Sequence, residues 1–291
     1  MKPPPFEYVA ATDLTQAIEA LVEGDGDAKL LAGGQSLVAM LNFRLLGPAV
    51  LVDINRLPDL DFVEADGDGL RIGALARHHA LETSALVAAR FPVLAAAMRH
   101  VGHLAVRNRG TIGGSLAHAD PAAELPLMAV LLEAGIKVVG GAGERTIPAE
   151  AFFQGALTTA LAEAEIVTEI GLPALPPGTG WGFEEVSRRA GDFALAAVAA
   201  TIRLDGDRVH EARLAVTGAG ETPLRVDAAE MLLRDRALDP GSMKAAADAA
   251  RAAVTPNDDL HASADYRRHL VGVLAGRALA AAGRRARGER P

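Results

Sequence analysis

Two glycine pairs in this sequence have neighbours suited to binding phosphate. The first lies in Leu30-Leu31-Ala32-Gly33-Gly34-Gln35-Ser36-Leu37 and the second in Thr111-Ile112-Gly113-Gly114-Ser115. Because glycine has no Cβ, the backbone at such a pair can turn sharply and direct its N–H groups outward. Successive N–H groups form a concavity for phosphate oxygens, to which Thr and Ser hydroxyls add donors. Two such stretches favour one ligand with two phosphates, held from both sides.

Asp120 follows the second pair, where its carboxylate can accept a hydrogen bond from a ribose hydroxyl. For a single glycine pair the competing interpretation is an ordinary turn before a helix, and the repetition of the pattern favours a ligand. A Cβ at Gly113 or Gly114 is expected to exclude the pyrophosphate while leaving the fold largely intact. Neither pair forms the six-residue Rossmann fingerprint or a P-loop, so ATP hydrolysis is not expected.

Cysteine is absent from the chain, which excludes disulfides, iron–sulfur clusters and thiol nucleophiles on its own side chains. His118 and Asp120 form a His-x-Asp pair, but two ligands are too few for a metal site, so none is predicted. Redox chemistry on this chain would therefore need a bound organic cofactor or a partner chain.

The composition is that of a globular chain with an acidic balance, with 291 residues, 50% hydrophobic content and a net charge of −8. Such a balance argues against a nucleic-acid-binding protein, which usually presents a basic face. No apolar run approaches the roughly 20 residues that span a bilayer. Residues 1–8 lack the apolar core of a signal peptide. We expect a cytoplasmic protein with no membrane span and no nucleic-acid partner.

Local patterns predict the elements that position these residues. A strand over 29–32 leads into the first glycine pair, a helix over 36–46 follows it, and a strand covers 50–54. Further strands are expected over 60–63, 70–72, 136–139, 145–147 and 166–172, and helices over 91–101 and 122–134. The stretch 111–120 between these two helices is expected to be a loop.

The clearest candidate for a domain boundary is residues 173–180, with three prolines and two glycines. It divides the chain into 1–177, with subdomains of about 1–56 and 57–177, and a second domain, 178–291. In the second domain, strands are expected over 181–187, 201–204 and 209–217, and helices over 193–200, 228–233, 242–254 and 264–285.

Four motifs in order carry a resemblance to a known family. They are Ala32-Gly33-Gly34-Gln35-Ser36, Arg107-Asn108-Arg109-Gly110-Thr111-Ile112-Gly113-Gly114-Ser115, Ala117-His118-Ala119-Asp120-Pro121-Ala122 and Arg188-Arg189-Ala190-Gly191-Asp192-Phe193-Ala194. The chain resembles, over nearly its whole length, the medium, FAD-binding subunit of the molybdenum hydroxylases, the carbon monoxide dehydrogenase and xanthine dehydrogenase family. The resemblance implies an α+β fold: the FAD-binding fold of the vanillyl-alcohol oxidase type, with two α+β subdomains, plus a C-terminal α/β domain of the carbon monoxide dehydrogenase flavoprotein type.

The resemblance also implies a function in electron transfer. Electrons would reach FAD on this chain from the 2Fe–2S clusters of a small subunit, after a large subunit with the molybdenum cofactor has oxidised the substrate. They would then pass to an external acceptor, within an expected dimer of heterotrimers. Because the cofactor carries the chemistry, no catalytic side chain is expected here.

The resemblance assigns cofactor-binding roles residue by residue. Residues Leu30, Leu31, Ala32, Gly33, Gly34, Gln35, Ser36 and Leu37 would hold the pyrophosphate together with Thr111, Ile112, Gly113, Gly114 and Ser115. Asp120 would bind near the adenosine ribose, Val167 would lie close to the cofactor, and Phe193 would sit against the isoalloxazine, with an ordinary core Phe as the alternative.

The sequence departs from the family pattern at three positions. Carbon monoxide dehydrogenases usually have Tyr at Phe193 and often Asn at Ser115, and xanthine-type relatives carry Lys near Glu184. The substrate therefore stays open among carbon monoxide, aldehydes, purines and N-heterocycles, as does the final acceptor. The roles of Arg107, Arg109, Glu184, Arg188 and Arg189 are also open. The alternatives for function are a stand-alone FAD-dependent oxidoreductase of this fold and a non-catalytic nucleotide-binding module.

Overall fold

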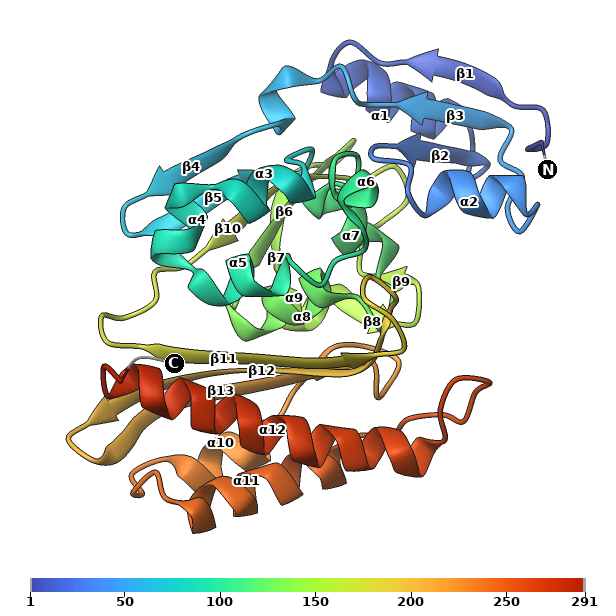
Figure 1. Cartoon of the computed structure of the whole chain (residues 1–291). Helices are drawn as coiled ribbons and strands as arrows, with labels where there is room; N and C mark the ends of the chain where they lie inside the picture. The colour runs from blue at the N-terminus through green and yellow to red at the C-terminus, as the bar shows by residue number, and fades with distance from the viewer. Residues whose placement is uncertain (1, 290–291) are drawn as a thin grey trace.

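The N-terminal subdomain is a small parallel sheet. The computed structural model describes residues 2–289 of the chain, and Figure 1 shows its three main sheets stacked from the N-terminus downward. The strands of the N-terminal subdomain pair in the order β1-β3-β2, all parallel. The elements are β1 (Glu7–Ala10), α1 (Leu14–Glu23), β2 (Ala28–Leu31), α2 (Leu37–Asn42) and β3 (Val50–Asp53). Asp13 caps α1 by accepting a hydrogen bond from the Gln16 N–H at 2.8 Å.

The middle subdomain is an antiparallel sheet of five strands in the order β4-β5-β10-β6-β7, covered by short helices. Its strands are β4 (Val63–Asp66), β5 (Gly69–Gly73), β6 (Gly135–Gly140), β7 (Gly143–Pro148) and β10 (Ile166–Leu172), with a small hairpin of β8 (Phe153–Gly155) and β9 (Thr158–Thr159). Its helices are α3 (His78–Thr83), α4 (Ala85–Arg90), α5 (Pro92–Ala97), α6 (Leu104–Arg107), α7 (Ile112–His118), α8 (Glu124–Leu131) and α9 (Ala149–Phe152), and the 3₁₀ turn is η1 (Pro58–Leu60). Every residue of α8 is buried, because the helix lies between this sheet and the C-terminal domain.

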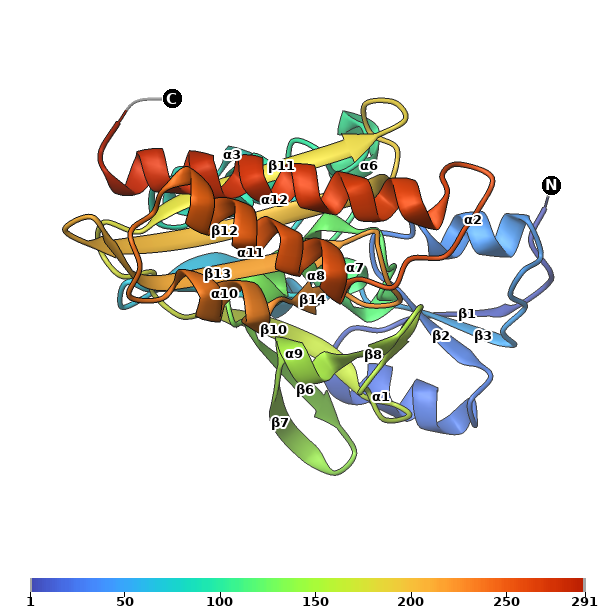
Figure 2. The same cartoon turned by 90° about the horizontal axis from the view of Figure 1, so that it is seen from below.

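The C-terminal domain is an antiparallel sheet with helices on one face (Figure 2). Its elements are β11 (Gly180–Ser187), β12 (Ala194–Asp205), β13 (Arg208–Thr217), β14 (Leu224–Arg225), α10 (Asp227–Leu233), α11 (Pro240–Ala253) and α12 (Ala264–Ala286). A Cβ at Gly180 or Gly182 would clash with the backbone of α12, so these glycines let β11 lie directly on that helix. The opposite face of the sheet packs on the middle subdomain.

The predicted helix over 193–200 is wrong, because this segment belongs to strand β12. Ala197 and Ala199 join the core of the middle subdomain, while Ala196, Val198 and Ala200 join the core under the C-terminal helices. A strand buried on both faces has no polar alternation, so a short apolar run cannot be told from a buried helix by its pattern.

The predicted loop over 111–120 is also wrong for most of its length. Thr111 caps helix α7, since its Oγ1 accepts a hydrogen bond from the Gly114 N–H at 3.2 Å. The helix ends at Ala119, which adopts a left-handed φ of 50°.

Between residues 2 and 289, no helix is both long and apolar enough to cross a membrane. The domain boundary at 177/178 stays a prediction.

Candidate cofactor site

The two glycine segments, here defined as residues 32–37 and 109–115, lie directly against each other. A Cβ at Gly33 would clash with the carbonyl oxygen of Arg109 and lie 2.8 Å from the Cα of Gly110. Gly33 is buried at this contact. The segments come from different subdomains, so the site lies where the two subdomains meet (Figure 1).

The first segment is an open cradle of hydrogen-bond donors. Gly34 has a φ of 74°, a conformation that glycine adopts without strain. The backbone N–H groups of residues 33–37 have no acceptor within the described part of the chain. Unpaired N–H groups are costly when water is excluded, so a run of them indicates a site for an anionic ligand.

In the second segment every backbone N–H group except that of Thr111 already has an acceptor. The Ile112 and Gly113 N–H groups donate to the carbonyl oxygens of Ala76 and Ala74, at 3.1 and 2.9 Å, and Gly114 donates to Thr111. A Cβ at Gly113 would lie 2.5 Å from the Cβ of Ala74. The glycine at 113 is therefore required for packing. The expectation that replacing it would leave the fold intact is wrong.

Asn55 and Arg77, which the sequence analysis did not single out, connect the two segments. The Asn55 Nδ2 donates to the carbonyl oxygens of Leu31 and Ala32, at 3.3 and 2.8 Å, at the start of the first segment. The Arg77 guanidinium donates to Asn55 Oδ1 at 2.7 Å and to the carbonyl oxygen of Arg109 at 2.6 Å. Asn55 follows β3 at the carboxyl end of a parallel sheet, next to the end of β2. That position could have indicated its closeness to the first segment.

Beneath the second segment lies a buried imidazole, His78. The backbone N–H of His78 donates to the Gly110 carbonyl oxygen at 2.9 Å, and a Cβ at Gly110 would lie 2.7 Å from the ring Nδ1 of His78. Neither ring nitrogen has a hydrogen-bond partner among the described residues. Burial lowers the pKa of His78 to about 4, so the ring is neutral at pH 7.

The remaining predicted residues differ in how accessible they are. One Asp120 oxygen accepts a hydrogen bond from the Ala122 N–H at 2.9 Å, and the residue is half-buried. The Val167 side chain is buried in the core of the middle subdomain. Phe193 is 60% exposed, so the alternative of an ordinary core Phe does not hold. Of the neighbouring arginines, Arg107 is held by Glu82 at 2.8 Å, whereas Arg109 is exposed.

Phe193 ends a loop that reaches over the middle subdomain between β11 and β12 (Figure 2). Gly191 in this loop has a φ of 83°, and a Cβ there would lie 2.7 Å from the ring of His103. Arg188 contacts His261 Nδ1 at 2.6 Å. The loop is thus anchored on both sides while the Phe193 ring stays accessible.

Comparisons with known proteins cover nearly the whole chain. A family model described as "FAD binding domain in molybdopterin dehydrogenase" matches residues 4–175, and one described as "CO dehydrogenase flavoprotein C-terminal domain" matches 181–282. The chain is 42% identical to the 6-hydroxypseudooxynicotine dehydrogenase complex subunit alpha of Paenarthrobacter nicotinovorans, over 99% of this chain and 97% of that protein. It is 41% identical to the carbon monoxide dehydrogenase medium chain of Hydrogenophaga pseudoflava, over 97% and 98%.

A solved structure shows the same fold. In carbon monoxide dehydrogenase from Hydrogenophaga pseudoflava, lacking the Mo-pyranopterin moiety of its cofactor, one chain superposes with a TM-score of 0.96, over 98% of this chain and 99% of that one. The chain belongs to the FAD-binding medium subunits of the molybdenum hydroxylases. The predicted family, and its FAD-binding and flavoprotein C-terminal domains, are thereby confirmed.

The donor set of this medium subunit fits FAD. The cradle of residues 33–37 offers N–H groups to a pyrophosphate, and Arg77 and Arg109 make no ion pair within the described residues. Asp120 keeps one carboxylate oxygen without a partner for a hydroxyl group. The accessible ring of Phe193 is suited to lie against a planar aromatic group.

A second cluster of titratable groups lies between the two domains of the medium subunit. Glu124, at the start of α8, is 5% exposed, and burial together with the nearby Glu185 raises its pKa to about 8. The contact of His100 Nδ1 with Glu185 at 3.5 Å raises the pKa of His100. The cluster therefore holds a proton on Glu124 at neutral pH, and it belongs to the domain interface.

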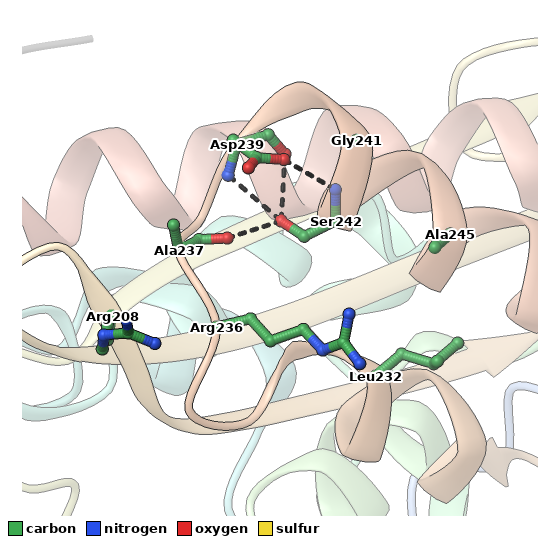
Figure 3. A pocket seen from close by; sticks show the side chains of 8 residues that line it. All are labelled: Arg208, Leu232, Arg236, Ala237, Asp239, Gly241, Ser242 and Ala245. Atoms are coloured by element: carbon green, nitrogen blue, oxygen red, sulfur yellow. Dashed lines mark hydrogen bonds between the residues drawn. The ribbon is translucent and has the colours of Figure 1, made fainter.

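A hollow of about 350 Å³ lies in the C-terminal domain, where Ser242 and Asp239 cap helix α11 (Figure 3). Arg208 and Arg236 line it. The Arg208 guanidinium already donates to the Asp235 carbonyl oxygen at 2.7 Å.

Across residues 2–289, no three His, Asp or Glu side chains gather as a metal site would require.

Proposed function

We propose that this medium subunit binds FAD across the two glycine segments, with the pyrophosphate in the cradle of residues 33–37. The observation that carries the proposal is the run of backbone N–H groups without acceptors in residues 33–37. The half-buried Ser115 adds a hydroxyl donor on the facing side, the buried Thr111 holds that segment by capping α7, and Asp120 takes a ribose hydroxyl. Because its side chain is buried, Val167 approaches the cofactor through its backbone.

Bound FAD supplies the electron-transfer chemistry, and the side chains of this chain act by binding and orientation. The N–H groups of the first segment neutralise phosphate oxygens without adding a full charge. The exposed Phe193 ring provides an apolar face against the isoalloxazine and keeps water from it. Phe lacks the hydroxyl group of Tyr, so this contact is purely apolar.

The partners follow from the relatives. Relatives include the medium chains of a carbon monoxide dehydrogenase and of a glyceraldehyde dehydrogenase. We propose a large molybdenum-cofactor subunit and a small iron–sulfur subunit as partners of this chain, doubled into a dimer of heterotrimers. Electrons would enter from the iron–sulfur subunit and leave to an external acceptor, in the cytoplasm. A boundary at 177/178 separates the FAD-binding domain from the C-terminal flavoprotein domain in this proposal.

The absorption spectrum of the purified full chain, before and after dithionite, tests the proposal. Flavin bands that bleach and return in air, with about one FAD per chain after heat release, are the expected result. A colourless protein that also fails to bind added FAD would contradict it. Co-expression with a cysteine-rich chain encoded by a neighbouring gene distinguishes a medium subunit from a stand-alone oxidoreductase. Only a medium subunit would form a stable complex with that chain.

A further inference from the structure

Asn55 and Arg77 link the two glycine segments through side chains alone. Asn55 Nδ2 holds the carbonyl oxygen of Ala32, and the opposite end of the same amide accepts a hydrogen bond from Arg77. Arg77 in turn holds the carbonyl oxygen of Arg109. One continuous line of hydrogen bonds therefore runs from the first segment to the second.

Further contacts within the chain hold both Asn55 and Arg77 in place. Asp53 Oδ1 contacts the Asn55 backbone N–H at 2.8 Å and its Nδ2 at 2.6 Å, and Asp53 Oδ2 accepts a hydrogen bond from the Tyr8 hydroxyl at 2.6 Å. Residues 77 and 111 pair as a short antiparallel bridge, which fixes the backbone at Arg77. Asn55 and Arg77 are both half-buried, and all partners of the line belong to the chain itself.

The guanidinium of Arg77 forms no direct ion pair with a carboxylate of the described residues. Burial and the neighbouring Arg109 charge lower the pKa of Arg77, while the carboxylates of Asp61 and Asp53 act more weakly in the opposite direction. Two cations beside a run of free N–H groups favour a ligand with more than one negative charge.

We infer that Asn55 and Arg77 form a clamp that sets the spacing of the two glycine segments and thereby positions the pyrophosphate of FAD. This inference rests on the proposed function. The planar fork of Arg77 makes two directed hydrogen bonds at once, to Asn55 and to Arg109. A lysine has one compact ammonium group on a flexible stem and cannot reproduce this geometry. Asn55 and Arg77 are positioning residues, since they act through the segments that they hold.

The test compares the affinity of the full chain for FAD and for ADP, which contains the pyrophosphate but no flavin. Asn55→Ala and Arg77→Ala should each weaken both affinities by about tenfold or more, the loss typical of a hydrogen bond to a charged group. Because both variants break the same link, the double variant should lose little more than either single one. Parallel losses place the effect at the pyrophosphate.

Arg71→Ala is the matched control, because Arg71 bonds Glu169 across two strands of the middle subdomain, at 2.5 Å. It should lower stability slightly and leave both affinities unchanged. Arg77→Lys keeps the charge and serves if Arg77→Ala fails to fold; it should still weaken both affinities. Wild-type affinities in Asn55→Ala or in Arg77→Lys, or additive losses in the double variant, would overturn the clamp. A wild-type chain that binds no FAD would instead overturn the proposed function.

Discussion

The two glycine segments look alike in sequence and differ in structure. In residues 32–37 the backbone N–H groups are free, and Gly34 is needed for its left-handed φ. In residues 109–115 the backbone N–H groups other than that of Thr111 are bound, and Gly113 is needed because Ala74 leaves no room for a Cβ. The first segment therefore has donors free for the proposed anionic ligand, whereas the second uses most of its donors within the chain. A glycine pair alone does not tell these two uses apart.

The largest effect that would sharpen this comparison is expected from Gly113→Val. The new side chain would meet the Cβ and backbone of Ala74, at 2.5 to 2.9 Å, and overpacking at this site should lower the free energy of unfolding by about 3 kcal/mol. Chemical denaturation of the FAD-free chain measures the loss. Gly141→Val is the control, since nothing lies within 4 Å of a Cβ there. Equal stability of the two variants would contradict the packing role of Gly113.

The second prediction concerns the pH dependence of stability, through Glu124 at the start of helix α8, which follows the second segment in the chain. Glu124 has a pKa raised to about 8, so the folded chain keeps its proton while the unfolded chain loses it near pH 4.5. The stability that this neutral carboxyl contributes is therefore complete below pH 4.5 and is lost as pH rises toward 8. Glu124→Gln removes the titration and should be more stable than wild type by about 4 kcal/mol at pH 8, because the pKa of Glu124 is raised from 4.5 to about 8.

Thermal unfolding between pH 5 and 8.5 checks this prediction. The two proteins should have similar stability at pH 5, and the difference should grow with pH. The Glu124 charge also raises the pKa of His100, so the difference between the two profiles reports Glu124 together with its coupling to His100. Parallel profiles for the two proteins would show that Glu124 is ionised in the folded chain at neutral pH.

A smaller effect is expected for Gly34→Ala in the first segment. A φ of 74° is strained for alanine, so the free energy of unfolding should fall by about 1 kcal/mol. Affinity for FAD should fall more steeply, because the cradle shifts to relieve the strain. Gly178→Ala is matched in strain, with a φ of 78°, but lies in the linker, away from the glycine segments. If it weakens FAD binding as much, the cradle assignment fails.

The smallest change in stability is expected for Phe193→Ala, because the ring is 60% exposed. Its effect should appear in the flavin absorption and redox potential instead, since the ring would no longer cover the isoalloxazine. Leu260→Ala, at a side chain that is 88% exposed on a neighbouring loop, should change neither property. Unchanged flavin properties in Phe193→Ala would separate this residue from the cofactor.

Much of the fold was predictable because its strands and caps are local. The strands over 29–32, 50–54 and 166–172 lie close to the observed β2, β3 and β10, and a ligand with phosphates was expected where the glycine segments meet. The predictions failed where tertiary contacts decide. Residues 194–200 form a strand because two cores bury them, and residues 112–118 form a helix because Thr111 caps them.

The link between the segments could not be predicted in the same way. Asn55 and Arg77 belong to no phosphate-binding motif, and their closeness arises only when the two subdomains meet. The free N–H groups of residues 33–37 are likewise a property of the folded chain, since the second glycine pair has the same composition and no free donors.

The proline-rich linker at 173–180 suggests a place to truncate the chain, but the interface between the middle subdomain and the C-terminal domain argues against it. The C-terminal sheet contributes Ala197 and Ala199 to the core of its neighbour, and Thr217 and Gly218 both donate to the carbonyl oxygen of Pro121 at 2.8 Å, next to Asp120. A truncated chain would expose an apolar face and leave that carbonyl unpaired. The two domains should therefore be expressed and purified as one chain. A chain truncated at the linker is expected to aggregate.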